Sequence, residues 1–300
     1  MINGKNRLRR TMMFVSAQRP ALIKDAYIYR PDSVILDLED AVAENQKDAA
    51  RFSLYHALKT VDYGDVERVV RINGLDTPHW REDIRACVAG GADAIRIAKC
   101  ESAKDVREVE AATAAAEAEF SREAGATLIM AAIESPRGLL NATEICAASS
   151  RLFGVAISGG DFRKCMQTKY YPSGVEMLVA RGQLLIAARA AGIQCFDTVF
   201  TDLDDMEGFT AEVILIKEMG FDGKSIVSPR QIGIVHDIFA PTEYEIIEAE
   251  KIVRTVRENA GKGIGVFTLD GKMLDIAFVP GAERVLAVAK ACGLYRGDLI

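Results

Sequence analysis

The sequence predicts an α/β protein whose main domain is a (β/α)8 TIM barrel. Eight short apolar segments alternate with eight helix-forming segments, an order typical of a parallel sheet. The units recur at roughly thirty residues, and eight of them fill the length that such a barrel needs. Residues 33–38 are apolar almost without interruption, as expected for a strand buried on both faces.

Polar residues follow most of the predicted strands, and each strand leads into a helix. The strands are residues 9–15, 33–38, 68–72, 94–98, 128–133, 152–157, 195–200 and 223–227. The helices that follow them are 20–27, 47–58, 80–89, 102–123, 138–148, 174–191, 206–219 and 229–239. Ser102 is a typical N-cap, and Gly192 and Gly220 are typical of residues that end helices. Residues 161–172 show no clear period and are predicted to form a loop.

A doubly wound open sheet is the alternative fold. It fits less well, because no G-x-G-x-x-G motif follows the first strand. Pro241 marks the expected boundary between a barrel domain, 1–240, and a C-terminal extension, 241–300. That extension reads as a helix, a hairpin turning at Asp270-Gly271, and a last helix. It could pack on its own barrel or lie at a subunit interface.

Composition excludes several classes of protein. The 37 Lys and Arg residues are outnumbered by 43 Asp and Glu residues, which argues against nucleic acid as a partner. No apolar run is long enough to span a membrane. The six cysteines are scattered without a C-x-x-C pair, which argues against zinc or redox motifs and indicates a reduced, cytoplasmic enzyme.

Acidic residues near the ends of the fifth and sixth strands form the first candidate site. The active site of a TIM barrel lies at the carboxyl ends of its strands, where Glu134 and Asp161 would be neighbours. Two such carboxylates suit Mg²⁺, which takes oxygen ligands and keeps water or substrate oxygens in its other positions. The alternative is that both acids cap the helices that follow them.

Other strand ends supply candidate substrate ligands. Arg71 ends a buried strand and would bind a carboxylate through two parallel hydrogen bonds. The alternative is a structural ion pair with Asp37 or Glu39. Asp37 and Lys224 are further substrate-binding candidates, and a solvated surface position is the alternative for Lys224.

Motifs in one order along nearly the whole chain resemble the citrate lyase β-subunit family, of the HpcH/HpaI aldolase type. They are Val34 to Val42 (VILDLEDAV), Val70 to Asn73 (VRIN), Ala132 to Pro136 (AIESP), Phe196 to Val199 (FDTV), Phe221 to Ser225 (FDGKS) and Leu269 to Asp275 (LDGKMLD). The resemblance implies a barrel enzyme that uses Mg²⁺ to cleave a citryl thioester to oxaloacetate and an acetyl thioester.

The same resemblance implies roles for individual residues. Glu134 and Asp161 match the family's metal ligands, and Glu134 would also contact the substrate. Arg71 matches the arginine that binds a substrate carboxylate and assists catalysis. Asp275 matches an acid that enters the site from an adjacent subunit in relatives acting on acyl-CoA, and it is our candidate for the proton transfer. We accordingly expect a homo-oligomer, a trimer or a hexamer, with an acyl carrier protein and other citrate lyase subunits as partners.

Two departures from the family pattern bear on the substrate rather than on the reaction type. Ser158-Gly159-Gly160-Asp161 stands where many members read G-A-E-D, and Ser16-Ala17 stands where many have Pro-Gly. Four alternatives therefore stay open. The chain could be a lyase, thioesterase or synthase for malyl-CoA or citramalyl-CoA, or a non-catalytic subunit of a larger complex.

Overall fold

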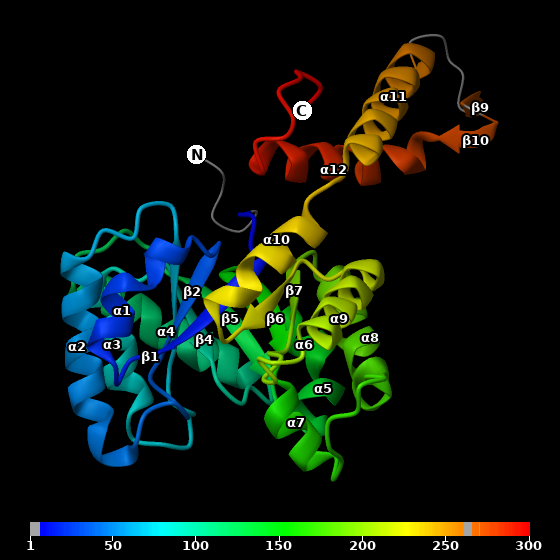
Figure 1. Ribbon diagram of the computed structural model, residues 1–300. Coiled ribbons are helices and arrows are strands. Elements are labelled where there is room, and N and C mark those ends of the chain that lie inside the picture. Colours follow the sequence, from blue (N-terminus) through cyan, green and yellow to red (C-terminus); the bar gives the residue numbers. More distant parts are fainter. Residues whose placement is uncertain (1–6, 261–265, 270) are drawn as a thin grey trace. The chain divides into compact units, whose positions relative to one another are not determined.

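Eight parallel strands close into a barrel in their sequence order, with β1 pairing with both β2 and β8 (Figure 1). This computed structural model describes residues 7–260, 266–269 and 271–300. The strands are β1 (Thr11–Ser16), β2 (Ser33–Asp37), β3 (Glu67–Arg71), β4 (Ala94–Ile97), β5 (Leu128–Ile133), β6 (Leu152–Ile157), β7 (Gln194–Asp197) and β8 (Gly223–Ile226). The predicted TIM barrel is confirmed.

Helices connect the strands and surround the barrel. The α-helices of this part are α1 (Pro20–Asp25), α2 (Lys47–Thr60), α3 (Trp80–Gly90), α4 (Ala103–Glu119), α5 (Pro136–Leu140), α6 (Ala142–Cys146), α7 (Gly159–Cys165), α8 (Val175–Ala190), α9 (Met206–Met219) and α10 (Ile232–Phe239). Short 3-10 turns are η2 (Ala26–Tyr29), η3 (Glu44–Gln46) and η4 (Pro229–Gln231).

Two expectations about helices were wrong in detail. Asp161 begins no loop, because α7 covers residues 159–165 and holds Asp161 in its first turn. The helix expected over 138–148 is two short helices, α5 and α6, which meet at Asn141. All three helices have seven residues or fewer and are too short to show the periodicity on which a prediction depends.

The barrel interior is filled by side chains from successive strands. Its buried cluster contains Met12, Ile35, Val69, Ala94, Met130, Phe153, Ala156 and Phe196. At the amino end of the strands, Arg9 donates two hydrogen bonds of 2.7 and 2.6 Å to Glu67. Where β8 meets β1, Gly223 is required, since a Cβ there would lie 2.0 Å from the Arg9 carbonyl oxygen.

A buried ionic network ties the last two strands to the helices behind them. Arg181 of α8 and Lys224 of β8 both bond Asp197 at the end of β7, with Nε–Oδ1 and Nζ–Oδ2 distances of 2.8 Å. Glu212 of α9 accepts from the same two cations, at 2.9 Å from Arg181 and 2.5 Å from Lys224. Burial opposes ionisation of Asp197, but the two cations prevail and lower its pKa to about 2. Two cations and two carboxylates thus balance each other away from water.

The C-terminal residues form a second compact unit. Residue contacts divide the chain into 1–235 and 236–300, close to the boundary expected at 240/241. The second unit contains α11 (Glu243–Ala260), the antiparallel hairpin β9 (Val266–Leu269) and β10 (Lys272–Asp275), the turn η5 (Ile276–Phe278) and α12 (Val279–Ala291). The predicted helix-hairpin-helix order is confirmed, although Asp270 of the expected turn lies outside the described residues. Its own core joins α11 to α12 through residues such as Val253 and Leu286.

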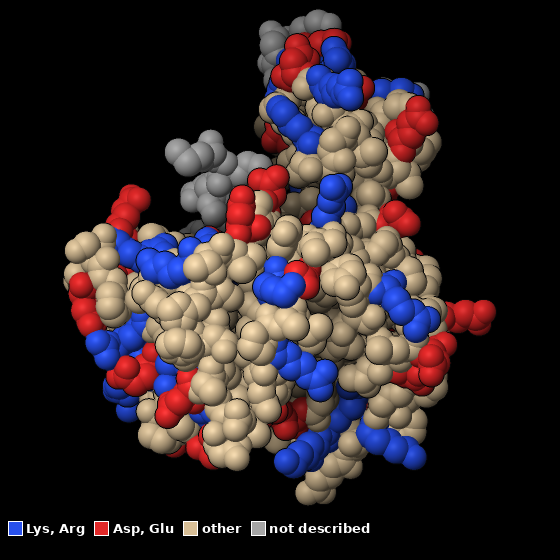
Figure 2. Space-filling view, turned by 60° about the vertical axis from the view of Figure 1, so that its left-hand side comes forward, with Lys and Arg blue, Asp and Glu red and all other residues tan. Residues whose placement is uncertain are grey.

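Figure 2 shows Lys and Arg interspersed with Asp and Glu over the face that it presents. Among the described residues, no helix has both the length and the apolar content for a membrane span.

The ionic network predicts a large structural cost for Lys224→Met. This change leaves Asp197 and Glu212 buried without one of their cations, and we expect a loss of about 3–5 kcal/mol in the free energy of unfolding. Urea denaturation measures it. Lys59→Met, at an exposed position of α2, is the matched control and should change stability by less than about 0.5 kcal/mol. Equal, small effects of both changes would contradict the structural role.

Candidate active site at the carboxyl ends of the strands

A pocket of about 280 Å³ opens at the carboxyl ends of the barrel strands. Residues from all the strands except β5 and β7 reach it directly, and the segments after β5, β6, β7 and β8 complete it. Its lining includes Phe14, Asp37, Arg71, Arg96, Glu134, Ser158, Gly160, Asp161, Thr198 and Ser225. The structure therefore brings together four of the predicted site residues, Asp37, Arg71, Glu134 and Asp161, from distant parts of the sequence.

Glu134 is a buried carboxylate that forms no ion pair with another described residue. Its side chain follows β5, the residue is 2% exposed, and neither carboxylate oxygen has a hydrogen-bond partner in the described part of the chain. Burial raises the pKa of Glu134 to about 7, against the opposing charges of Arg71 and Arg96. An orphaned carboxylate of this kind is costly unless something cationic binds it.

Asp161 lies on the same pocket, in the first turn of α7. No side-chain hydrogen bond to its carboxylate is found among the described residues. Together the two acids offer hard oxygen donors, which fit Mg²⁺. No set of three or more His, Cys, Asp or Glu residues capable of holding a metal occurs within the described ranges. The protein would thus supply two carboxylates and leave the other positions to water or substrate.

Arg71 is held rigidly by two acids. Its Nε and Nη2 donate to the two oxygens of Asp37 at 2.7 and 2.6 Å, and its Nη1 lies 3.0 Å from Glu39. Although burial opposes its charge, the bonds to Asp37 keep the pKa of Arg71 above its ordinary value. The predicted ion pair and the predicted pocket position are therefore both present. Two of the five guanidinium N–H groups remain for a substrate carboxylate.

Asp37 lines the pocket but its oxygens are already used. Besides Arg71, they accept from the backbone N–H groups of Glu39 at 3.0 Å and Ala41 at 3.3 Å. We therefore assign Asp37 as a positioning residue for Arg71 rather than a direct substrate ligand. Glu39 also accepts from Lys99, whose backbone takes a left-handed conformation with φ of 49°. Strained residues of this kind cluster at functional sites.

Lys224 is not a substrate ligand, contrary to our expectation. Its ammonium is fully buried and its three hydrogen bonds go to Asp197, Glu212 and the Thr198 carbonyl. Strand side chains alternate between the two faces of a sheet. Because Ser225 lines the pocket, its neighbour Lys224 faces the surrounding helices.

Arg96 is a pocket residue that the sequence reading missed. It is 1% exposed, and among the described residues its guanidinium donates hydrogen bonds to the hydroxyls of Ser158 at 3.1 Å and Ser225 at 3.5 Å. Burial and the charge of Arg71 lower its pKa to about 10. A signal was present, because Arg96 is the one charged residue within the strand Ala94-Ile95-Arg96-Ile97.

Asp275 belongs to the C-terminal unit, at the end of β10. There its side chain accepts a hydrogen bond of 2.8 Å from the backbone N–H of Ala277 and caps η5. Its entry into the site of an adjacent subunit stays a prediction.

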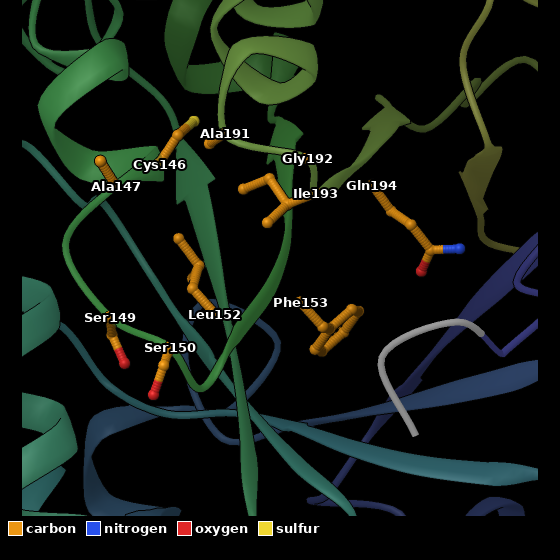
Figure 3. A pocket seen from close by; sticks show the side chains of 10 residues that line it. All are labelled: Cys146, Ala147, Ser149, Ser150, Leu152, Phe153, Ala191, Gly192, Ile193 and Gln194. Atoms are coloured by element: carbon orange, nitrogen blue, oxygen red, sulfur yellow. The ribbon is translucent and has the colours of Figure 1, made fainter. Parts of the chain in front are cut away.

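A second cavity, of about 390 Å³, lies near the starts of β6 and β7. Figure 3 shows its lining, which includes Leu152, Ile193 and Cys146. Cys146 is its only ionisable side chain among the described residues, and burial raises the pKa of that thiol to about 12. This cavity, at the opposite ends of the strands from Glu134, offers no groups for acid, base or metal chemistry.

Comparison with known proteins agrees with this site. The family model for HpcH/HpaI aldolase/citrate lyase matches residues 10–229. The chain belongs to this family. The match covers all eight barrel strands, and the motifs around Arg71, Glu134 and Asp161 lie inside it.

Relatives of the family resemble the chain over nearly all its length. The "Citrate lyase subunit beta" of Leuconostoc mesenteroides subsp. cremoris is 52% identical, over 96% of this chain and 95% of that protein. A "(3S)-malyl-CoA thioesterase" of Cereibacter sphaeroides is 35% identical, over 96% of this chain and 97% of that protein. The citrate lyase beta subunit of M. tuberculosis, solved with oxaloacetate and magnesium, superposes with a TM-score of 0.66 at 30% identity, covering 80% of this chain and all of that one. The resemblance seen in the motifs is thus confirmed.

Gly160 departs from the family motif, and the fold does not require a glycine at this position. It lies in α7 on the pocket wall, and a Cβ there would have no atom within 4 Å. The missing acid thus leaves open space beside Asp161 and disturbs no packing.

Because the Glu134 carboxylate is open, its replacement should weaken Mg²⁺ binding without lowering the free energy of unfolding. Glu134→Gln should weaken Mg²⁺ binding at least about 100-fold, since a neutral amide replaces one of two charged ligands. It should not lower the free energy of unfolding, because an unpaired buried carboxylate contributes none. Isothermal titration with Mg²⁺ and urea denaturation of the apoprotein measure the two effects.

Glu144→Gln, in the first turn of α6, is the matched control and should bind Mg²⁺ as the native chain does. Native-like Mg²⁺ affinity in Glu134→Gln would remove Glu134 from the metal site.

Proposed function

We propose that this chain cleaves a citryl thioester to oxaloacetate and an acetyl thioester with the help of Mg²⁺, as a citrate lyase β subunit. The observation that carries the proposal is the pair of open carboxylates, Glu134 and Asp161, beside Arg71. The 52% identity to a citrate lyase subunit beta supports it over almost the full length of both chains.

The pocket is suited to hold the half of the substrate that becomes oxaloacetate. Glu134 and Asp161 would hold Mg²⁺, which when bound supplies a Lewis acid for the oxygen on the carbon that becomes the keto group. Arg71, fixed by Asp37 and Glu39, presents its remaining N–H groups to a carboxylate of the substrate. A rigid guanidinium orients that carboxylate with little loss of side-chain entropy.

Cleavage is a retro-Claisen reaction with two proton transfers, one from the hydroxyl group of the substrate and one to the carbon of the departing enolate. A carboxylate removes the proton of the substrate's hydroxyl group, and the carbonyl forms as the adjacent carbon–carbon bond breaks. The electron pair of that bond goes to the departing acetyl thioester as an enolate, which then takes up a proton at carbon. We propose Asp275 of an adjacent subunit as the residue that accepts the hydroxyl proton.

The proposal includes partners and location. We propose a homo-oligomer, a trimer or hexamer, that works with other citrate lyase subunits and takes its thioester from an acyl carrier protein. Cys87, Cys100, Cys146, Cys165 and Cys195 form no disulfide bond, which supports a reducing compartment such as the cytoplasm.

Activity on a panel of thioesters tests the reaction. The native chain with Mg²⁺ should release oxaloacetate from a citryl thioester with a kcat/KM at least about tenfold above that for release of glyoxylate or pyruvate from malyl-CoA or citramalyl-CoA. Glu134→Ala and Asp161→Ala should each abolish the Mg²⁺-dependent cleavage. Full activity in either variant would contradict the assignment of that residue as a metal ligand. Preference for malyl-CoA would favour the activity of the thioesterase relative, and absence of both cleavage and Mg²⁺ binding would favour a non-catalytic subunit.

The position of Asp275 predicts complementation between inactive variants. Asp275→Asn and Glu134→Gln should each lose nearly all activity alone. Co-expressed in equal amounts, they should regain about a quarter of it, since random pairing joins an intact barrel to an intact Asp275 in one interface of four. Lysates mixed after separate folding are the control. Failure of co-expression to restore activity would argue that Asp275 acts within its own subunit or not at all.

A further inference from the structure

Arg96 differs from the other fully buried arginines of the described chain. Arg9 pairs with Glu67, and Arg181 pairs with Asp197. Arg96 forms no ion pair within the described residues, and its Nε has no hydrogen-bond partner there. Its Nη1 contact with Ser225, at 3.5 Å, is long for a hydrogen bond.

An arginine left in this condition indicates an absent anion. A buried charge is costly unless it is paired, and a guanidinium cannot discharge itself by losing a proton near neutral pH. Arg96 lines the pocket together with Glu134. The pocket thus holds an open anion, suited to a metal ion, and an open cation, suited to a second charge of the substrate.

Arg71 cannot serve both carboxylates of a dicarboxylic substrate. Three of its N–H groups are engaged by Asp37 and Glu39, which leaves two for one carboxylate. The Cζ atoms of Arg71 and Arg96 both lie 5.1 Å from the centroid of the Phe14 ring. This shared ring supports two separate guanidinium groups on one wall of the pocket.

We propose that Arg96, with the hydroxyls of Ser158 and Ser225, forms a second carboxylate subsite that selects dicarboxylic keto acids. It would bind the carboxylate on the carboxymethyl arm of the oxaloacetate half, while Arg71 and the metal pair hold the other end. This inference rests on the proposed function.

The subsite distinguishes the three candidate substrates by chemistry. The citryl half that leaves as oxaloacetate carries a carboxymethyl group. The malyl and citramalyl halves, which leave as glyoxylate and pyruvate, carry hydrogen and methyl in its place. A buried guanidinium without its carboxylate stays unpaired, so the shorter keto acids gain nothing from Arg96.

A different role for Arg96 makes a different prediction. If the arginine only stabilises the ionised form of Glu134, its removal weakens every metal-dependent ligand equally. If it binds the arm carboxylate, its removal weakens oxaloacetate and spares pyruvate.

Equilibrium binding of two keto acids separates these roles. Dissociation constants of oxaloacetate and pyruvate are measured by calorimetry at fixed Mg²⁺ for the native chain and for Arg96→Met. We expect oxaloacetate to bind about 100-fold more weakly to the variant, as a lost charge-assisted pair predicts, and pyruvate to change less than about threefold. Equal weakening of both ligands, or unchanged affinity for oxaloacetate, overturns the subsite.

Two further variants protect the test from a folding failure. Ser225→Ala removes one small hydroxyl and should weaken oxaloacetate about two- to tenfold without affecting pyruvate. Arg71→Lys, which alters the end of the site common to both ligands, should weaken both. A pattern in which Ser225→Ala weakens the two ligands alike also overturns the subsite.

The binding assay needs no turnover, so the two proposals fail separately. A native chain that binds oxaloacetate through Arg96 but cleaves no citryl thioester refutes the proposed function and retains the subsite. A native chain that cleaves citryl thioester while Arg96→Met keeps full oxaloacetate affinity refutes only the subsite.

Discussion

The alternation of side chains along closed barrel strands is the constraint on which the other features depend. Each strand gives one residue in two to the interior and the next to the helix layer. On β8, Ser225 faces the pocket and Lys224 faces the helices. On β4, Arg96 reaches the pocket, while Ile95 and Ile97 on either side are buried elsewhere. A shift of a strand by one residue would turn pocket residues such as Ser225 toward the helices and turn structural ions such as Lys224 toward the pocket.

Buried charges are paired with one another on the helix side of the strands, whereas two buried charges in the pocket form no ion pair among the described residues. Behind the strands, Asp197, Glu212, Arg181 and Lys224 satisfy one another, so the network is complete without a ligand. In the pocket, Glu134 and Arg96 are buried and remain open. Complete networks stabilise or specify a fold, whereas incomplete ones cost stability and are kept where a ligand completes them. The open groups therefore mark the site more clearly than the size of a cavity does.

Most of the fold could be predicted from the sequence, because it depends on local patterns. Apolar runs of strand length and helix-ending glycines such as Gly220 locate the barrel units, and β5 and β6 begin and end at the predicted residues. The short helix α7 could not be predicted, since its conformation follows from tertiary contacts, such as the 2.7 Å bond from the Gly159 N–H to the Thr198 hydroxyl.

The candidate site was predicted only in part, for a related reason. Glu134, Asp161 and Arg71 stand at strand ends and in motifs, so sequence position alone points to them. The direction in which the Lys224 side chain points, and the lack of a carboxylate beside Arg96 in the described chain, both depend on contacts between residues far apart in the sequence. The contact between Arg96 and Ser225 joins residues 129 apart in the chain, and no local pattern reports whether a buried cation finds a carboxylate.

The proposed roles place the shared reaction and the choice of substrate on different residues of the pocket, so proteins with this site can share a mechanism and differ in substrate. In the proposed function, Glu134 and Asp161 would hold the metal at the oxygen on the carbon whose bond breaks, and Arg71 would bind the carboxylate attached to that carbon. These features are common to citryl, malyl and citramalyl thioesters. What differs among these substrates is the group on the far side of that carbon, and the groups that can meet it are Arg96, Ser158 and Ser225. Gly160, by contrast, lies open beside Asp161, next to the shared chemistry. A change there would act on metal and turnover for all substrates, whereas a change at Arg96 would act on the choice among them.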